Sequence, residues 1–209
     1  KSEIRYIRQR IYSMGESVYQ DFPWRKTSNL FHALTAEIFL QRTKANQVLP
    51  VYRNFTRTYE DPSDVINDGK KEYETILEPL GLKWRIPLFY NLCKELTEEY
   101  GGKVPVDREI LLSLPGIGDY VVSAFLSFHF NEPLPLVDAN TVRFVGRFFK
   151  METGPESRRD RKFKGVIKEL LSKRYSRRFN YAFLDFSMNI CSTVPKCGEC
   201  NLRRKCKFY

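Results

Sequence analysis

Histidine and long apolar runs are scarce in this sequence. His32 and His129 are the two histidines among 209 residues, and we expect both to serve packing or to lie at the surface. No run approaches the ~20 apolar residues that a membrane-spanning helix needs. The chain begins Lys1-Ser2-Glu3, without an initiator methionine or the apolar core of a signal peptide. Strand signals are weak, and internal repeats are missing. These absences predict an intracellular protein without a membrane segment.

Basic residues exceed acidic ones. Thirty-five Lys and Arg stand against 25 Asp and Glu, which gives a formal net charge of +10 at pH 7. A basic surface attracts polyanions, of which nucleic acid is the commonest, although a solvated surface without a ligand has the same composition. Hydrophobic residues make up 42% of the chain, enough for a buried core.

Helical periodicity dominates the chain. Apolar residues that recur every three or four positions predict long helices, and Gly and Pro separate these patterns. The sequence therefore predicts an all-α protein. The expected helices lie at 4–19, 30–41, 46–59, 84–100, 108–113, 119–130, about 139–149, about 160–174 and 177–190, with short helices between 61 and 80.

A glycine-containing turn joins two of these helices. Its sequence is Leu114-Pro115-Gly116-Ile117-Gly118, and the next helix starts at Asp119. Glycines permit positive φ, and their N–H groups precede a helix N-terminus, so the turn can bind phosphate without a charged side chain. Leu114 and Ile117 would pack the two helices together. This predicts a DNA-binding hairpin, with an ordinary helix connection as the alternative.

Asp138 stands where another helix begins. Leu136 and Val137 precede it, and Ala139-Asn140 follow. The helix dipole favours an ionised carboxylate at this position, and the apolar neighbours would limit access of water. Taken alone, the pattern is that of an N-cap aspartate that only starts the helix.

Four of the five cysteines lie near the C-terminus with the spacing C-x5-C-x2-C-x5-C. Thiolates this close can ligate one metal centre, and in an intracellular protein metal binding is favoured over disulfides. The spacing alone leaves zinc and a four-iron–four-sulfur cluster open. Cys93, within a helical pattern, is expected in the core. The candidate ligands are Cys191, Cys197, Cys200 and Cys206.

Together these motifs resemble the helix-hairpin-helix–Gly/Pro–Asp superfamily of DNA glycosylases. The resemblance is strongest to the iron–sulfur branch with endonuclease III, MutY and the thymine–guanine mismatch glycosylases. It spans nearly the whole chain. It rests on the hairpin through Tyr120, on Val137-Asp-Ala-Asn140 and the cysteine tail, and on the segments Phe22-Pro-Trp-Arg25, Ala36-Glu-Ile-Phe-Leu-Gln-Arg-Thr43, Leu80-Gly-Leu82 and Tyr100-Gly-Gly-Lys-Val-Pro105.

The resemblance implies three catalytic residues. Asp138 matches the aspartate required for base removal, where its charge would stabilise an oxocarbenium-like sugar. Glu37 matches the glutamate of the base pocket; the alternative is a buried acid paired with an Arg. Bifunctional members carry lysine where this chain has Tyr120, and a phenol cannot form their Schiff base. Tyr120 therefore implies a monofunctional enzyme, even if it only packs on the hairpin helix.

Other implied roles concern the DNA and the cofactor. Gln41 and Arg42 stand where the family inserts polar side chains toward the orphaned base, and Leu82 and Lys83 stand in the loop that wedges the opposite strand; both pairs could instead be plain surface. The family's spacing is C-x6-C-x2-C-x5-C with a cubane cluster, so one residue is missing from the first gap here. The implied cofactor is a 4Fe-4S cluster, with zinc as the alternative.

The expected architecture has two helical domains, one of residues 28–137 with the hairpin, the other of 1–27 and 138–209 with the cluster loop. The expected function is removal of thymine or uracil opposite guanine from a base flipped out of duplex DNA. Alternatives are a MutY-like adenine glycosylase, a glycosylase for another modified pyrimidine, and a non-catalytic iron–sulfur DNA-binding module. We expect a monomer in the cytoplasm or nucleoid of a prokaryotic cell.

Overall fold

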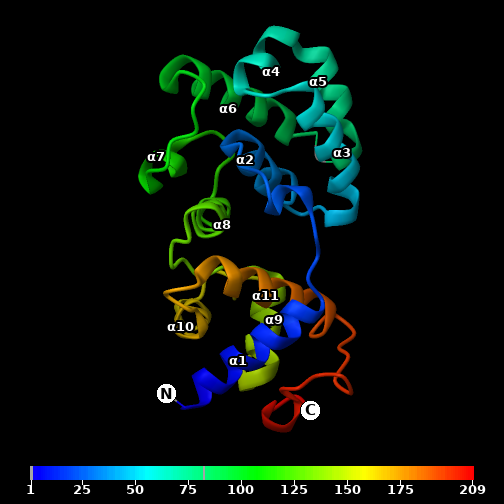
Figure 1. The fold of residues 1–209 in the computed structure, drawn as a ribbon, viewed down its shortest axis with the longest axis vertical. Coiled ribbons are helices and arrows are strands. Elements are labelled where there is room, and N and C mark those ends of the chain that lie inside the picture. Colours follow the sequence, from blue (N-terminus) through cyan, green and yellow to red (C-terminus); the bar gives the residue numbers. More distant parts are fainter. Residues whose placement is uncertain (1, 82) are drawn as a thin grey trace. The chain divides into compact units, whose positions relative to one another are not determined.

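A computed structural model describes residues 2–81 and 83–209, and the secondary structure of these residues is entirely helical (Figure 1). No helix in this part of the chain has the length and apolar character needed to cross a membrane. The all-α prediction is therefore confirmed. The helices are α1 Ser2–Ser17, η1 Pro23–Arg25, α2 Leu30–Phe39, α3 Ala45–Thr58, α4 Pro62–Asp68, α5 Lys70–Leu77, η2 Glu78–Leu80, α6 Arg85–Tyr100, α7 Arg108–Ser113, α8 Asp119–Phe130, α9 Ala139–Phe149, α10 Arg161–Leu170, α11 Ser176–Asn189 and η3 Arg203–Lys205.

The contacts within the chain divide it into two compact units. Unit 2 is the continuous segment 22–125, and unit 1 combines residues 1–21 with 126–209. Unit 1 therefore depends on packing between segments that are far apart in sequence.

Unit 1 is built around aromatic rings from α9, α10 and α11, which α1 covers. Phe144 meets Phe183 and Phe186 edge-on, each with ring centroids 5.4 Å apart. Such edge-to-face pairs stabilise a core beyond the area they bury. The fully or almost fully buried members of this core include Ile7, Ile11, Phe144, Phe148, Phe163, Phe179, Phe183 and Phe186.

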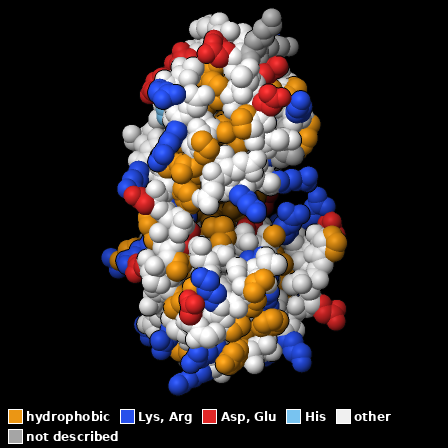
Figure 2. Space-filling view, turned by 90° about the vertical axis from the view of Figure 1, so that its right-hand side faces the viewer, with side chains coloured by type: hydrophobic (Ala, Val, Ile, Leu, Met, Phe, Trp, Pro, Cys, Tyr) orange, Lys and Arg blue, Asp and Glu red, His pale blue; other side chains and the backbone are white. Residues whose placement is uncertain are grey.

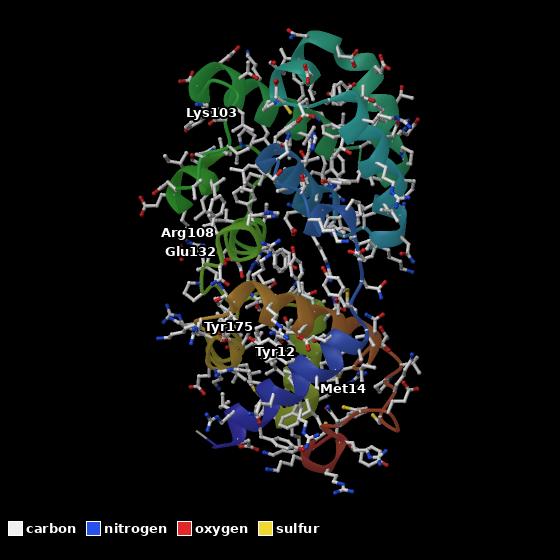
Figure 3. All side chains as sticks on the ribbon, in the orientation of Figure 1. Tyr12, Met14, Lys103, Arg108, Glu132 and Tyr175 are labelled. Carbon is white, nitrogen blue, oxygen red and sulfur yellow. The ribbon has the colours of Figure 1, made fainter. Side chains whose placement is uncertain are left out.

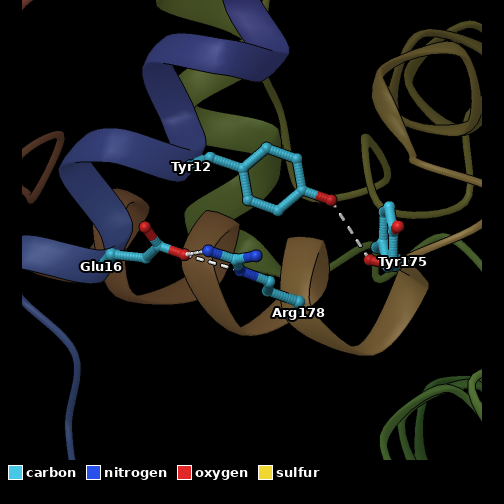
Figure 4. A network of polar contacts seen from close by, with 4 residues as sticks. All are labelled: Tyr12, Glu16, Tyr175 and Arg178. Carbon is cyan, nitrogen blue, oxygen red and sulfur yellow. Dashed lines mark hydrogen bonds and ion pairs between the residues drawn. The ribbon is translucent and has the colours of Figure 1, made fainter.

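Polar contacts fix α1 against the rest of unit 1. The Arg8 guanidinium donates to the carbonyl oxygens of Leu170 at 2.8 Å and of Leu171 at 2.9 Å, where α10 ends. The last carbonyls of a helix lack intrahelical partners, so Arg8 caps α10 from another helix. Figure 4 shows a second link, in which Arg178 of α11 donates to the Glu16 carboxylate from Nε at 2.6 Å.

Gly15 lets α1 and α11 approach closely. A Cβ atom at Gly15 would lie 2.2 Å from the backbone oxygen of Ala182. Because backbone cannot move aside as a flexible side chain can, this position admits only glycine in the present packing.

Unit 2 surrounds α2. Every residue from Phe31 to Phe39 is buried, as expected for a central helix. The rings of Phe31, Phe39 and Phe89 each contact Phe55, with centroid separations of 5.3–5.9 Å. This aromatic cluster holds the helix that carries Glu37.

Candidate functional site

The hairpin of unit 2 has the geometry that its sequence predicts. Asp107 caps α7 by accepting hydrogen bonds from the N–H groups of Glu109 at 2.9 Å and Ile110 at 3.0 Å. Leu114 and Ile117 are buried, 2% and 8% exposed. They hold the turn between α7 and α8 in place.

The glycines leave the backbone of the turn accessible. Gly116 has φ +75°, and Gly118 has no atom within 4 Å of the position of a Cβ. Both glycines are exposed, so their N–H groups lie at the surface just before α8. Arg108 of α7, labelled in Figure 3, forms an ion pair with Asp119, the first residue of α8. This ion pair closes the hairpin.

Tyr120 lies in the first turn of α8 and is half-buried. A residue at this place follows the exposed turn directly along the chain. Its phenol has no amine with which to attack a sugar carbon. The structure leaves its catalytic role a prediction.

Glu37 is buried on α2, 5% exposed. Burial raises the pKa of its carboxyl from 4.5 to about 7, because desolvation disfavours the charged form, while the nearby Arg25 guanidinium acts in the opposite direction. Near neutral pH, Glu37 can therefore hold or release a proton. Arg25, itself buried in η1, is the arginine whose charge acts on the Glu37 carboxyl.

Arg85 orders the turn that follows α2. It is 8% exposed, and its guanidinium donates to the carbonyl oxygens of Ile38, at 2.6 Å, and Gln41, and to the Thr43 hydroxyl at 3.2 Å. Arg42 lies between these anchors with φ +59°, which is uncommon for a residue with a side chain. No local pattern predicts this role, because an isolated Arg at a helix start is typical of a surface position.

The turn also contacts the hairpin. The Gln41 amide lies 3.5 Å from the carbonyl oxygen of Gly116. A shallow apolar groove between them is lined by Leu88, Phe89 and Pro115. Gln41 and the hairpin turn, both predicted to contact DNA, are thus neighbours within unit 2.

The loop before α6 is described only in part. Leu82 lies outside the described residues. Lys83 is exposed, with its ammonium 3.5 Å from the Glu78 carboxylate. Trp84 follows with 54% of its surface exposed, and it was not among the residues predicted to contact DNA. An exposed tryptophan is a suitable surface for stacking on a base.

In unit 1, Asp138 is the N-cap of α9. Its Oδ1 accepts from the N–H groups of Asn140 at 3.0 Å and Thr141 at 2.8 Å, and its Oδ2 accepts from the Asn140 amide at 2.5 Å. Three donors and a helix N-terminus thus surround this half-exposed carboxylate and fix its orientation. The N-cap prediction is confirmed, and it is compatible with a catalytic role.

Two arginines of α9 hold the start of the cysteine tail. Arg143 donates from Nε to the Cys191 carbonyl oxygen at 2.9 Å and from Nη2 to the Asn140 side-chain oxygen at 3.0 Å. Arg147 donates to the Ser192 carbonyl oxygen at 2.6 Å, and its Nη1 lies 3.7 Å from the Cys191 sulfur. These contacts fix the backbone of the tail against α9.

The cysteines of the tail are free and half-buried, and three of them, Cys191, Cys200 and Cys206, pack against the core of unit 1. Burial raises the pKa of the Cys200 thiol, a backbone hydrogen bond from Leu202 lowers it, and the charges of the other three tail cysteines raise it further. Over the described ranges, no three Cys, His, Asp or Glu side chains stand in metal-binding geometry. The four thiols are a donor set that suits a thiolate-bound metal centre. The fifth cysteine, Cys93, is buried in the core, as expected.

Comparisons with known proteins agree with this geometry. Residues 35–169 match the HhH-GPD superfamily base excision DNA repair protein family. The thymine/uracil-DNA glycosylase of Pyrobaculum aerophilum is 34% identical over 91% of this chain and 85% of its own length. The thymine-DNA glycosylase of Aeropyrum pernix is 32% identical over 100% and 96%.

Solved structures show the same fold. The structure of a thermostable thymine-DNA glycosylase superposes with a TM-score of 0.91 and 30% identity, covering 100% of this chain and 97% of the other. A non-covalent endonuclease III–DNA complex superposes with a TM-score of 0.85 at 23% identity, covering 99% and 95%, which supports the fold alone. The chain belongs to the HhH-GPD superfamily of base-excision DNA repair proteins, the helix-hairpin-helix DNA glycosylases.

Proposed function

We propose that this DNA glycosylase is monofunctional and removes thymine or uracil opposite guanine. The observation that carries the reaction type is Tyr120 in the first turn of α8, where the strand-cleaving relatives need a lysine. The choice of base is supported by the names of the similar proteins, thymine/uracil- and thymine-DNA glycosylases.

In this proposal Asp138 is the catalytic carboxylate. Its three hydrogen-bond donors hold it ready, and its negative charge stabilises the positive charge that develops on the sugar as the C1′–N bond breaks. Water then completes hydrolysis and leaves an abasic site. Glu37 donates a proton or a hydrogen bond to the leaving base, which a pKa of about 7 permits at neutral pH. Tyr120 contributes packing at the site.

The hairpin binds the DNA backbone. The backbone N–H groups of Gly116 and Gly118 bind a phosphate, helped by the N-terminal dipole of α8, while the Ile117 N–H donates to the Leu114 carbonyl oxygen at 3.2 Å and shapes the turn. Extrusion of a base costs a few kcal/mol, least at a mismatch. Gln41 and Arg42 interact with the orphaned base, and the loop that includes Lys83 supports the strand opposite.

We also propose that Cys191, Cys197, Cys200 and Cys206 hold a 4Fe-4S cluster, as the family resemblance implies. When bound, the cluster supplies a structural cross-link between the two ends of the tail, since base hydrolysis transfers no electrons. Arg143 and Arg147 hold the first ligand's backbone independently of it. Purified protein with the cluster is brown, whereas a zinc protein is colourless. We place this monomeric enzyme with chromosomal DNA.

The decisive experiment measures base release and strand scission on a panel of duplexes. The panel holds T·G, U·G, A·8-oxoguanine and oxidised-pyrimidine pairs with matched controls. Strand scission at T·G or U·G only after alkali, and its loss in Asp138→Asn with DNA binding retained, supports the proposal. Scission without alkali contradicts the monofunctional assignment. Release of adenine instead of thymine supports the adenine-glycosylase alternative. This chain is also similar to the adenine DNA glycosylase of Mycobacterium tuberculosis, which is 28% identical over 88% of this chain and 62% of its own length.

A further inference from the structure

All of the excess positive charge belongs to unit 1. Unit 1 contains 22 Lys and Arg against 11 Asp and Glu, whereas unit 2 contains 13 against 14. In the view of Figure 2, Lys and Arg side chains recur over the surface. The hairpin, which grips phosphate through its backbone, therefore lies in the unit without excess charge, and the positive charge of unit 1 calls for a separate explanation.

One group of exposed cations in unit 1 lies on and beside α10. We call five exposed residues the α10 basic surface: Arg158, Arg161, Lys162, Lys168 and Lys173. Arg159 and Arg178 are left out because they pair with Glu156 and Glu16. Among nearby acids, Asp160 accepts the Lys162 N–H as the cap of α10, and Glu169 is exposed on the helix.

The other side of α10 is apolar. Phe163, Ile167 and Leu170 are buried in the core of unit 1. The helix is therefore held rigidly with its cations outward. Its ten residues span about 15 Å, the axial length of four to five base pairs at about 3.4 Å per phosphate of one strand.

Gly165 provides an independent observation. It lies in the interior of α10, exposed, between cations one turn before and one turn after it. Glycine is unfavourable inside a helix, and no atom of the protein lies within 4 Å of the position of a Cβ here. Gly15, by contrast, is required by the backbone of α11. Contacts within this chain do not explain why residue 165 is glycine. Close approach of a binding partner's backbone to α10 would explain it.

We propose that the α10 basic surface, with Gly165 at its centre, binds the phosphate backbone of duplex DNA as a second contact separate from the hairpin. Duplex DNA fits because it presents closely spaced phosphates along a rigid line, which matches cations held along a rigid helix. Such contacts read no sequence, so they serve association with undamaged DNA and the search along it. The proposal rests on the DNA-binding part of the proposed function but not on the base removed.

The first test compares two matched triple variants. Arg161→Gln, Lys162→Gln and Lys168→Gln neutralise the surface; Arg57→Gln, Lys94→Gln and Lys103→Gln remove the same charge from exposed positions in unit 2. The affinity for an undamaged 30-base-pair duplex is measured from 50 to 300 mM salt. Each lost phosphate contact reduces the slope of log K against log salt by about 0.9. We expect a reduction of about 2 to 3 for the α10 triple, with at least tenfold weaker binding, and little change in slope for the control.

Equal slopes for the two triples would overturn the proposal, because the loss would then be a general effect of net charge. Base release in single turnover at saturating enzyme should remain unchanged in both triples. If the wild type releases no base from any duplex but the slopes differ as expected, the second surface stands and only the proposed function fails.

The second test uses Gly165 itself. Gly165→Leu adds a helix-favouring side chain where the protein leaves space, so its thermal midpoint should equal or exceed that of the wild type. Binding to the undamaged duplex should nevertheless weaken at least fivefold, because the side chain separates α10 from the backbone of the DNA. A stable variant with unchanged affinity would refute the close approach. Leucine placed at the exposed Gly154, which also has no neighbour within 4 Å, serves as the control.

Discussion

Replacement of Glu37 by glutamine should make the protein more stable at alkaline pH. The change keeps the shape of the side chain and removes its ability to ionise. The pKa of Glu37 is about 7 in the folded protein, because the carboxyl is buried, against an ordinary value of 4.5. This difference corresponds to about 3 kcal/mol of folding free energy, at about 1.4 kcal/mol for each pH unit.

The pH dependence has a definite sign. Below pH 4.5 the folded and unfolded chains both bind the proton, so Glu37 does not lower the free energy of unfolding. Between pH 4.5 and 7 the unfolded chain releases its proton while the folded protein keeps it, so stability falls as the pH rises. Above pH 7 both states are ionised and the loss is complete. The Glu37→Gln variant shows no such fall in stability, because glutamine does not ionise.

The assay is urea unfolding of wild type and Glu37→Gln from pH 4.5 to 8.5. The free energy of unfolding of the variant minus that of the wild type should rise by about 3 kcal/mol across this range. Any missing hydrogen bond of the amide adds a constant that does not vary with pH. Glu99→Gln, at an exposed position on α6, is the control. A difference that stays flat from pH 5 to 8 would show that burial does not hold the proton on Glu37.

Three further substitutions test contacts described above. Gly15→Ala should destabilise unit 1 by about 3 kcal/mol or more, since its methyl group would meet the backbone of Ala182; thermal unfolding would show this, and an unchanged midpoint would contradict the close crossing. Arg85→Met should cost about 2–3 kcal/mol by removing the charged donor from the Ile38 and Gln41 carbonyl oxygens, and urea unfolding beside Arg53→Met measures it; a loss below 0.5 kcal/mol would contradict the anchoring role. Arg8→Met should cost about 1–2 kcal/mol and speed amide exchange at the end of α10 more than elsewhere. Uniform exchange in that variant would argue against capping.

Local patterns predicted the helices well. The hairpin helices begin and end where capping Asp107 and the glycine turn place them. The differences fall at ends set by packing. α10 stops at Leu170 rather than near 174, because Leu171 turns into the core with an extended backbone.

Long-range contacts set the limit of prediction for the site. Asp138 could be predicted because an N-cap is a local feature. The roles of Arg85 and Arg143 could not, since, apart from Asn140 beside Arg143, their partners lie 42–48 residues away along the chain. Gly15 and Gly165 could not be distinguished from the sequence either, because both are glycines within helical patterns. Only the fold shows that Gly15 lies at a tight helix crossing and Gly165 on an open surface.

Unit 1 combines an N-terminal and a C-terminal segment of the chain, and this affects how it folds during synthesis. Residues 22–125 form a continuous unit, so all of its contacts become possible while later residues are still being translated. The helix α1 ends at Ser17 and emerges long before its main partners, α10 and α11, which begin at Arg161 and Ser176. Until then the apolar face with Ile7 and Ile11 is exposed to solvent and to other nascent chains. The helix α1 is thus made long before it can pack, and its apolar face is a target for molecular chaperones until α10 and α11 have emerged.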